Sequence, residues 1–226
     1  MRTAAILPVK HFAQAKRRLG ESVAGELRDD LARAMVGDVL VALSETVSIE
    51  RTIVVTREDS VAAAAREIGA LTVEDTAEAS QSAAVALGVA RALTEGFERV
   101  LCIPGDCPAL DPVELDSLLD TSDAREVVIV PDRHGTGTNG LLLRPPDAIA
   151  LSFGPGSCER HQALAREAGV NHRLERPASL LLDIDTGADL AVLRDRLSGE
   201  RIRATRTRAV LGLPVDSYIL SSTTRG

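Results

Sequence analysis

The sequence predicts an α/β fold: a single domain of three layers, in which helices cover both faces of a mostly parallel mixed sheet. Short runs of aliphatic and β-branched residues alternate along the chain with longer segments of helical periodicity, which is the order that produces a doubly wound sheet. The 226 residues are 45% hydrophobic and 26% charged, so the chain has enough apolar material for one domain of ordinary size.

The first half of the chain has clear examples of both patterns. Residues 3–8 are predicted to form the first strand, and apolar residues that recur every fourth position from Leu27 to Leu43 indicate one face of a long helix. The same criteria predict strands at 51–56, 71–74 and 100–103, and helices at 61–68, 82–93 and 112–119.

The alternation continues through the second half and then fades. Strands are predicted at 127–130, 141–143 and 180–184, and helices at 157–168 and 188–197. From Ser198 onward the chain turns basic and loses clear periodicity. We therefore expect one domain over residues 1–197, followed by a basic C-terminal tail or edge extension over 198–226.

Composition argues against several classes of function. The formal net charge is −7, aromatic residues make up 2% of the chain and Trp is absent, so we expect no nucleic-acid partner. No window approaches the ~20 apolar residues of a membrane span, and Pro8 and Lys10 interrupt the N-terminal apolar run too early for a signal peptide. We expect a cytoplasmic protein. Its three cysteines lack CxxC spacing, which argues against a disulfide framework and against a structural zinc site.

In doubly wound folds the ligand lies beyond the carboxyl ends of the strands, and the loop after the first strand is basic. It contains Lys10 and Lys16, the only lysines of the chain, followed by Arg17 and Arg18. Lysine is a compact point charge, which suits a cluster of phosphates. Neither a P-loop nor a GxGxxG pattern is present, so a solvated basic loop is the alternative interpretation.

Acidic residues follow two other predicted strands. Asp106 lies in a tight turn between Gly105 and Pro108, where it is either a ligand of a hard cation such as Mg²⁺ or the cap of the next helix. Asp183 and Asp185 project to the same face if the strand at 180–184 persists. Thr186 or Asp185 as a helix cap would account for one of these acids but not both. Together the three carboxylates predict a site for one or two magnesium ions.

Two glycine-rich segments, 133–139 and 153–157, suit a small phosphate or carboxylate. Their turns expose backbone N–H groups, Thr136 and Thr138 supply hydroxyls, and Ser157 is placed to cap a helix whose N-terminus attracts anions. His161, one turn later, either lines the same pocket or packs in the core. The alternative for the whole set is ordinary turn chemistry with an N-cap.

Attack of one phosphate on another explains the three groups of residues together. Two unit charges 4 Å apart repel by about 4 kcal/mol at an effective dielectric of 20, so a phosphate approaches a triphosphate only where cations offset the repulsion. Magnesium and lysines supply that charge and stabilise a departing pyrophosphate. A substrate phosphate ionised above pH ~6 needs no general base, which agrees with the lack of an evident catalytic triad.

Five motifs, in order, resemble the family of 2-phospholactate or phosphoenolpyruvate guanylyltransferases of coenzyme F420 biosynthesis. They are LPVKHFAQAKRRL, GDCPAL, DRHGTGTNGLLL, FGPGSCERHQALA and LDIDTGADL. The family belongs to the wider class of Rossmann-like nucleotidyltransferases, of the nucleotide-diphospho-sugar transferase type, that includes molybdenum-cofactor guanylyltransferases. The resemblance implies transfer of GMP from GTP to the phosphate of a three-carbon acid, with release of pyrophosphate. A labile product implies a downstream transferase as a partner.

The resemblance also implies roles for individual residues. Asp106, Asp183 and Asp185 would ligate Mg²⁺, and Thr138, Gly154 and Ser157 would hold the phosphorylated acid. Lys10, Lys16 and Asp106 would be catalytic, and Lys10, Lys16, Arg17 and Ser82 would bind the nucleotide. At 80–84 the chain reads SQSAA where the family commonly has an LNAA-like segment, so Gln81 and Ser82 offer the guanine different donors and acceptors.

The acceptor is expected to be phosphoenolpyruvate, because the Arg- and Ala-rich composition is typical of a GC-rich bacterial gene. The product would then be enolpyruvyl-diphospho-guanosine. The alternatives are 2-phospho-L-lactate or 3-phosphoglycerate as acceptor, another nucleotidyltransferase acting on a sugar phosphate or a molybdopterin, and a non-catalytic nucleotide-binding relative. A nucleotidyltransferase for sugar phosphates or molybdopterin would have a longer LxGGxSxRMG-type loop, which is missing here. A non-catalytic relative should have lost one of the three acids, and all three are present.

Overall fold

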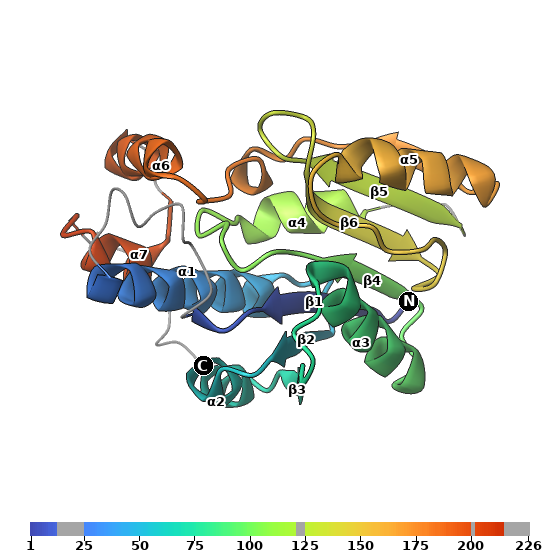
Figure 1. Cartoon of the computed structure of the whole chain (residues 1–226), viewed down its shortest axis with the longest axis horizontal. Helices are drawn as coiled ribbons and strands as arrows, with labels where there is room; N and C mark the ends of the chain where they lie inside the picture. Colours follow the sequence, from blue (N-terminus) through green and yellow to red (C-terminus); the bar gives the residue numbers. More distant parts are fainter. Residues whose placement is uncertain (13–24, 121–124, 200–201, 215–226) are drawn as a thin grey trace.

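The computed structural model of the protein (Figure 1) describes residues 1–12, 25–120, 125–199 and 202–214. A seven-stranded sheet forms the middle layer, and its strand order is β3-β2-β1-β4-β6-β5-β7. The strands are β1 (Thr3–Val9), β2 (Arg51–Thr56), β3 (Leu71–Val73), β4 (Arg99–Cys102), β5 (Glu126–Pro131), β6 (Thr138–Arg144) and β7 (Asn171–Leu174). Only β6 runs antiparallel to its neighbours, β4 and β5. The expected mostly parallel mixed sheet is therefore confirmed.

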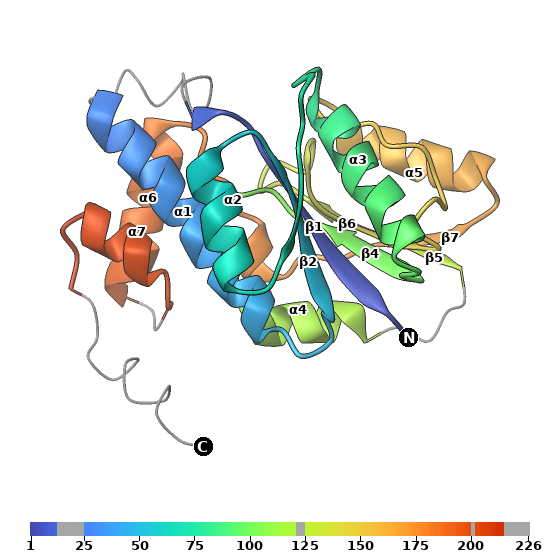
Figure 2. The same cartoon turned by 90° about the horizontal axis from the view of Figure 1, so that it is seen from below.

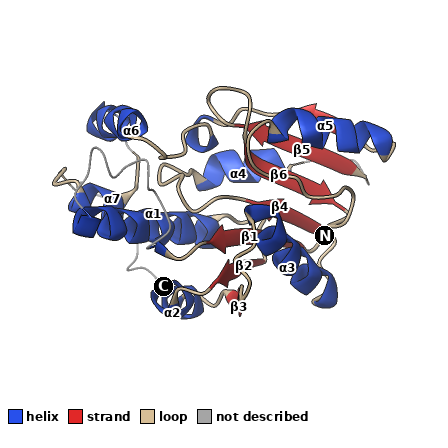
Figure 3. Cartoon of the chain, in the orientation of Figure 1, coloured by secondary structure: helices blue, strands red, loops and turns tan. Residues whose placement is uncertain are grey.

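Helices cover both faces of this sheet (Figures 2 and 3). They are α1 (Gly25–Glu45), α2 (Asp59–Glu67), α3 (Gln81–Thr94), α4 (Pro112–Leu119), α5 (Ser157–Glu167), α6 (Gly187–Gly199) and α7 (Thr205–Val210). Successive side chains of a strand point to opposite faces, and β1 illustrates the result. Ala5 and Leu7 pack with α1, α2 and α4, whereas Ala4 and Ile6 pack with α3 and α5.

The C-terminal segment packs on the outer side of α1. Leu31 and Met35 of α1 share a third apolar cluster with leucines of α6 and with Leu211. Asp38 on α1, which is buried, accepts the backbone N–H groups of Arg206 and Thr207 at 3.0 and 2.8 Å. The segment after residue 197 thus contains the end of α6 and a further helix, α7, for which the basic composition gave no periodic signal. The domain boundary at 197 stays a prediction.

Two expectations about individual elements are wrong. The predicted strand at 180–184 is absent: a 3₁₀ helix spans Ala178–Leu180, and irregular backbone follows it. The strand that completes this side of the sheet is β7, whose sequence NHRL is polar and half-exposed, so it lacks an apolar pattern. The three cysteines all lie within the described residues, and each is a buried thiol. None of the described helices combines the length and the apolar character that crossing a membrane requires.

Candidate active site

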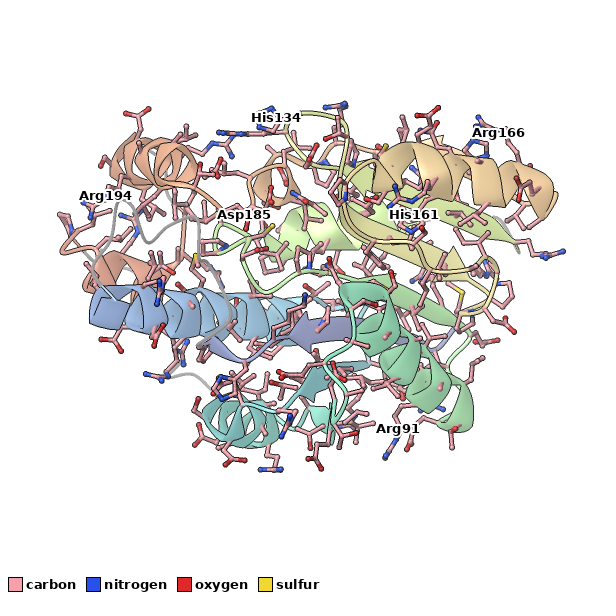
Figure 4. The ribbon with its side chains drawn as sticks, viewed as in Figure 1. Arg91, His134, His161, Arg166, Asp185 and Arg194 are labelled. Atoms are coloured by element: carbon pink, nitrogen blue, oxygen red, sulfur yellow. The ribbon has the colours of Figure 1, made fainter. Side chains whose placement is uncertain are left out.

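A cleft of about 690 Å³ opens where β1 and β4 end and β6 begins. The predicted site residues that line it are Lys10, Asp106, Thr138, Gly154, Ser157, Asp183 and Asp185. They come from five separate segments, which are loops or the first residues of β6 and α5. The strand order brings these segments to one edge of the sheet, as expected for a doubly wound fold. Figure 4 labels Asp185, in the loop that leads to α6, and His161, on the side of α5 that faces the sheet.

The acidic loops after β4 and before α6 are in direct contact. The backbone N–H of Ile184 donates to the carbonyl oxygen of Asp106 at 3.1 Å. Burial, followed by the negative charge of Asp106, raises the pKa of Asp183, and the charge of Asp185 adds to this effect. Asn139 on β6 partly opposes it, because its Nδ2 donates to Asp183 Oδ1 at 3.1 Å. The two acidic loops therefore concentrate negative charge at one point of the cleft.

Helix caps account for neither Asp106 nor the pair Asp183 and Asp185. The cap of α4 is Asp111, whose Oδ1 accepts the N–H of Val113 at 2.8 Å, so the alternative of Asp106 as that cap is wrong. At the start of α6, Thr186 and Asp189 exchange hydrogen bonds: Thr186 N–H donates to Asp189 Oδ2, and Asp189 N–H donates to Thr186 Oγ1. This reciprocal arrangement is a capping box.

The carboxylates of the cleft fit some of the requirements of a Mg²⁺ site. Across the ranges that the structure describes, no three His, Cys, Asp or Glu side chains form a preassembled group that could hold a metal ion. Mg²⁺ in phosphate-transfer sites is usually held by one or two carboxylates, while substrate phosphates and waters supply the other oxygens. Asp106 and Asp183, whose charges interact within the cleft, suit that mode of binding. The donors are oxygens only, which is the chemistry that Mg²⁺ prefers.

The basic loop is described only at its start. Lys10 is exposed and lines the cleft, and the next two residues are fixed by acidic side chains of neighbouring loops. His11 N–H donates to Glu78 Oε1 at 3.2 Å, and Phe12 N–H donates to Glu58 Oε1 at 2.6 Å. Lys16 and Arg17 lie outside the described residues.

Ser82 is placed differently from its expected role at the nucleotide. Its Oγ accepts the backbone N–H of Phe153 at 2.9 Å, so this hydroxyl holds the loop before α5. Gln81, its neighbour at the start of α3, is the residue that lines the cleft there. The nucleotide-binding role of Ser82 stays a prediction.

Thr138 and Ser157 form a hydroxyl pair at the far end of the cleft. Ser157 Oγ donates to Thr138 Oγ1 at 3.0 Å. The expectation that Ser157 caps α5 is wrong, because Gly156 is the N-cap residue, at φ 73°, and Ser157 is already inside the helix. The first amides of α5 are also engaged: Ser157 N–H donates to the Gly154 carbonyl and Cys158 N–H to the Thr136 carbonyl. Hydroxyls, rather than these amides, are left to meet an anion.

The loop before α5 is held by several side chains. Arg160 Nε donates to Ser152 Oγ at 2.8 Å, and its Nη2 donates to the Ser152 carbonyl at 3.0 Å. His161 is completely buried and accepts the N–H of Ser152 at 3.1 Å. Gly154 has φ 108°, a conformation that other L-residues rarely adopt. The loop is thus shaped before any ligand arrives.

Sequence reasoning missed three polar residues of the cleft. Asp75, Asp132 and Asn139 all line it. Asn139 also donates to the Leu180 carbonyl at 2.9 Å, and Asp132 accepts the N–H of Thr136 at 2.9 Å. Asp132 and Asn139 lie within or beside a glycine-rich segment that was singled out, so that segment was the available signal. Asp75 had no such signal, whereas Gln81 was already indicated by the SQSAA segment at 80–84.

The chain is similar to known guanylyltransferases over most of its length. A family model described as "Guanylyl transferase CofC like" matches residues 3–217. The phosphoenolpyruvate guanylyltransferase of Conexibacter woesei is 49% identical over 214 residues, which is 93% of this chain and 96% of that protein. The 2-phospho-L-lactate guanylyltransferase of Methanothermobacter thermautotrophicus is 35% identical over 190 residues, or 84% of this chain and 83% of that protein.

Solved structures share the fold. A putative nucleotide-diphospho-sugar transferase from Desulfovibrio desulfuricans superposes with a TM-score of 0.75, at 19% identity, over 94% of this chain and 95% of that one. At that identity the likeness concerns the fold alone. The family match over nearly the whole chain and the 49% identical relative carry the stronger conclusion: the protein belongs to the CofC-like guanylyl transferase family.

Proposed function

We propose that this protein transfers GMP from GTP to the phosphate of phosphoenolpyruvate, giving enolpyruvyl-diphospho-guanosine and pyrophosphate, as a step in coenzyme F420 biosynthesis. One observation carries the proposal: a single cleft brings together an ammonium group, two acidic loops and a pair of hydroxyls. Cations are needed wherever two phosphates approach, and the hydroxyls suit the anionic groups of a small acid. The 49% identical relative from Conexibacter woesei is named for this reaction.

The reaction needs no proton transfer from the protein. A phosphate oxygen of phosphoenolpyruvate bonds to the α-phosphorus of GTP, and the bond from that phosphorus to the oxygen bridging to the β-phosphate breaks. Its electron pair leaves with pyrophosphate. Because the attacking phosphate is ionised above pH ~6, the protein must only align the two anions and stabilise the charge that develops on the leaving group.

At the nucleotide end of the cleft we assign Lys10, with Lys16 and Arg17, to the triphosphate. Lys10 is the residue that directly follows β1. Because its ammonium group is carried on a flexible stem, it can follow pyrophosphate as pyrophosphate departs. Asp106, Asp183 and Asp185 would hold Mg²⁺, which when bound offsets phosphate charge and supports the leaving group. Asn139 keeps Asp183 oriented through its 3.1 Å hydrogen bond.

At the acceptor end we assign Thr138, Gly154 and Ser157 to the phosphorylated acid. The hydroxyl pair is nearly enclosed: Thr138 is 8% exposed and Ser157 1% exposed. Hydrogen bonds to an anion are stronger in such a low-dielectric place than in water. The open backbone at Gly154, where an added Cβ would meet nothing within 4 Å, leaves room for the acid beside the pair.

The test is turnover by the purified protein with GTP, Mg²⁺ and one acid at a time: phosphoenolpyruvate, 2-phospho-L-lactate or 3-phosphoglycerate. Pyrophosphate release and the mass of the product are measured, and the labile product is also trapped with the downstream transferase and its deazaflavin acceptor. We expect the highest kcat/KM with phosphoenolpyruvate. Preference for another acid would reassign the acceptor, and binding of GTP without turnover of any acid would favour a nucleotide-binding module instead.

A further inference from the structure

His161 lies behind the hydroxyl pair and touches it, yet it does not line the cleft. Its Nδ1 is 3.1 Å from Thr138 Oγ1, and its Nε2 is 3.1 Å from the backbone nitrogen of Ser152. The Phe153 ring packs against it edge-on, with the ring centroids 5.1 Å apart. Both ring nitrogens are therefore in use, and the imidazole has no exposed surface.

The partner of Nε2 determines which nitrogen holds the proton. A backbone N–H can only donate, so Nε2 must accept from Ser152 and cannot carry a hydrogen itself. Burial, with a smaller effect from the charge of Arg160, lowers the pKa of His161 to about 4, which keeps the ring neutral at pH 7. A neutral imidazole whose Nε2 accepts has its single proton on Nδ1. That proton is donated to Thr138 Oγ1.

The number of hydroxyl protons in the pair determines what the pair presents to the cleft. Thr138 and Ser157 together have two hydroxyl protons, and their mutual hydrogen bond consumes one of them. Since His161 donates to Thr138, the second proton cannot turn back toward the imidazole. It must point to a group outside the pair, whichever hydroxyl carries it.

We propose that His161 is a positioning residue: by donating from Nδ1 to Thr138, it forces the Thr138–Ser157 pair to present a hydroxyl donor to the anionic acceptor substrate. The proposal rests on the function assigned above to Thr138 and Ser157. If Nδ1 accepted instead, Thr138 could donate to the ring and Ser157 to Thr138, and only lone pairs would face the anion. The engaged amides of Ser157 and Cys158 make this hydroxyl donor harder to replace.

Two variants that resemble each other in shape separate the donated proton from the packing of the side chain. In His161→Asn, the amide Nδ2 occupies the place of Nδ1 and can donate to Thr138. In His161→Leu, a side chain shaped like that of asparagine occupies the site without a donor. Both variants lose the acceptor for Ser152, so their difference reports the Nδ1 proton. We expect His161→Leu to raise the KM for phosphoenolpyruvate about tenfold or more, the scale of a hydrogen bond to a charged group. His161→Asn should stay within about threefold of the wild type, with the KM for GTP nearly unchanged in both.

A double-mutant cycle tests whether the effect passes through Thr138. Because Thr138→Val removes the hydroxyl that His161 acts on, adding His161→Leu to it should raise the KM for phosphoenolpyruvate no further. Equal losses in the Asn and Leu variants, or losses that multiply in the double mutant, would overturn the proposal, since either result describes a histidine that only packs.

The tautomer can be read without any turnover. In protein labelled with ¹⁵N histidine, a long-range ¹H–¹⁵N correlation at pH 7 distinguishes the Nδ1–H form from the Nε2–H form. The chain has 4 histidines, and substituting each of the other three, His11, His134 and His172, identifies the signal of His161 by elimination. We expect the Nδ1–H form, and an Nε2–H or a doubly protonated ring would overturn the inference even if the variants failed to fold. If no acid were turned over, the function proposed above would fail, while this spectrum would still decide the tautomer.

Discussion

Ile184 donates its backbone N–H to the carbonyl oxygen of Asp106 at 3.1 Å, and this bond fixes the distance between the two acidic loops. The side chains of Leu182 and Ile184 are buried in the apolar cluster beneath α6. Asp183 and Asp185 alternate with them and line the cleft. The alternation expected of a strand is therefore present in irregular backbone, because core packing at every second residue leaves the residues between to face the ligand.

Asp183→Asn should abolish turnover and yet stabilise the metal-free protein. Because the folded protein raises the pKa of Asp183 above its ordinary value, this group favours folding most below the unfolded pKa, and the benefit is lost as pH rises through the folded pKa. At neutral pH the charged form opposes folding. Removing it should raise the free energy of unfolding at pH 7 by on the order of 1 kcal/mol. The gain should shrink as pH falls through the raised pKa of the folded protein, and it should be absent below about 4, the ordinary pKa of an aspartate.

Urea unfolding in EDTA, and separately in saturating Mg²⁺ and GTP without EDTA, checks this expectation. Ligands that bind the folded form stabilise it by mass action, so the wild type should gain stability from Mg²⁺ and GTP and Asp183→Asn should gain less. Asp195→Asn, at an exposed position on α6, is the matched control and should change neither quantity. A destabilised metal-free Asp183→Asn variant would contradict the electrostatic account of this loop.

Lys10→Ala should lower kcat/KM for GTP by about 10- to 100-fold and leave the free energy of unfolding unchanged, because the side chain is exposed. Lys10→Arg is the informative partner variant: it keeps the charge but replaces a point ammonium with a planar fork, so it should recover only part of the rate. Steady-state kinetics on the three proteins, with thermal unfolding as the stability measure, decide the outcome. A rate for Lys10→Ala within twofold of the wild type would return this loop to the interpretation of a solvated basic turn.

Residues that point into the core could be predicted well from the sequence. Along α1, the apolar positions repeated every fourth residue from Leu31 to Leu43 are buried, although Leu27, the first of the series, is exposed. The apolar runs of β1, β2, β4 and β5 occur in the structure within one or two residues of the predicted bounds. Asp106 and Thr138, which were singled out because they follow apolar strands, both line the cleft, and their roles there stay predictions. The placements were predicted correctly because burial imposes a period on the sequence, and strand ends follow from where that period stops.

Elements without a buried period could not be predicted. β7 is a polar edge strand, and α7 is short and basic, with its N-terminus held by Asp38 of α1. Contacts of this kind join residues far apart in the chain and leave no local pattern. The same holds for Asn139, whose function is visible only through its hydrogen bonds to Leu180 and Asp183.

Asp38→Ala should destabilise the protein by about 1–2 kcal/mol, the usual effect of losing a helix N-cap. The carboxylate accepts the first amides of α7 from a neighbouring helix, so its removal leaves those amides without their acceptor. Thermal unfolding and limited proteolysis of the C-terminal segment measure the effect. Asp30→Ala, which removes only an exposed ion pair with Arg33 on the same helix, should cost less than about 0.5 kcal/mol. Equal effects of the two substitutions would show that α7 does not depend on this contact.

Gly88→Ala should destabilise the protein although alanine is the better helix former. A Cβ at Gly88 on α3 would lie 2.5 Å from Ile6 Cγ2 and 3.2 Å from Val55 Cγ2, both on buried strands, so α3 would have to move off the sheet. Overpacking of this kind costs about 1–3 kcal/mol, against a gain of about 1 kcal/mol in helix propensity. Gly37→Ala is the matched control: its Cβ would meet only the side chain of Arg206, at 2.6 Å from Cδ and 3.0 Å from Nε, and this exposed side chain can swing away. Urea unfolding should therefore show a loss for Gly88→Ala and none for Gly37→Ala, whereas equal stability of the two variants would mean that α3 can shift without cost.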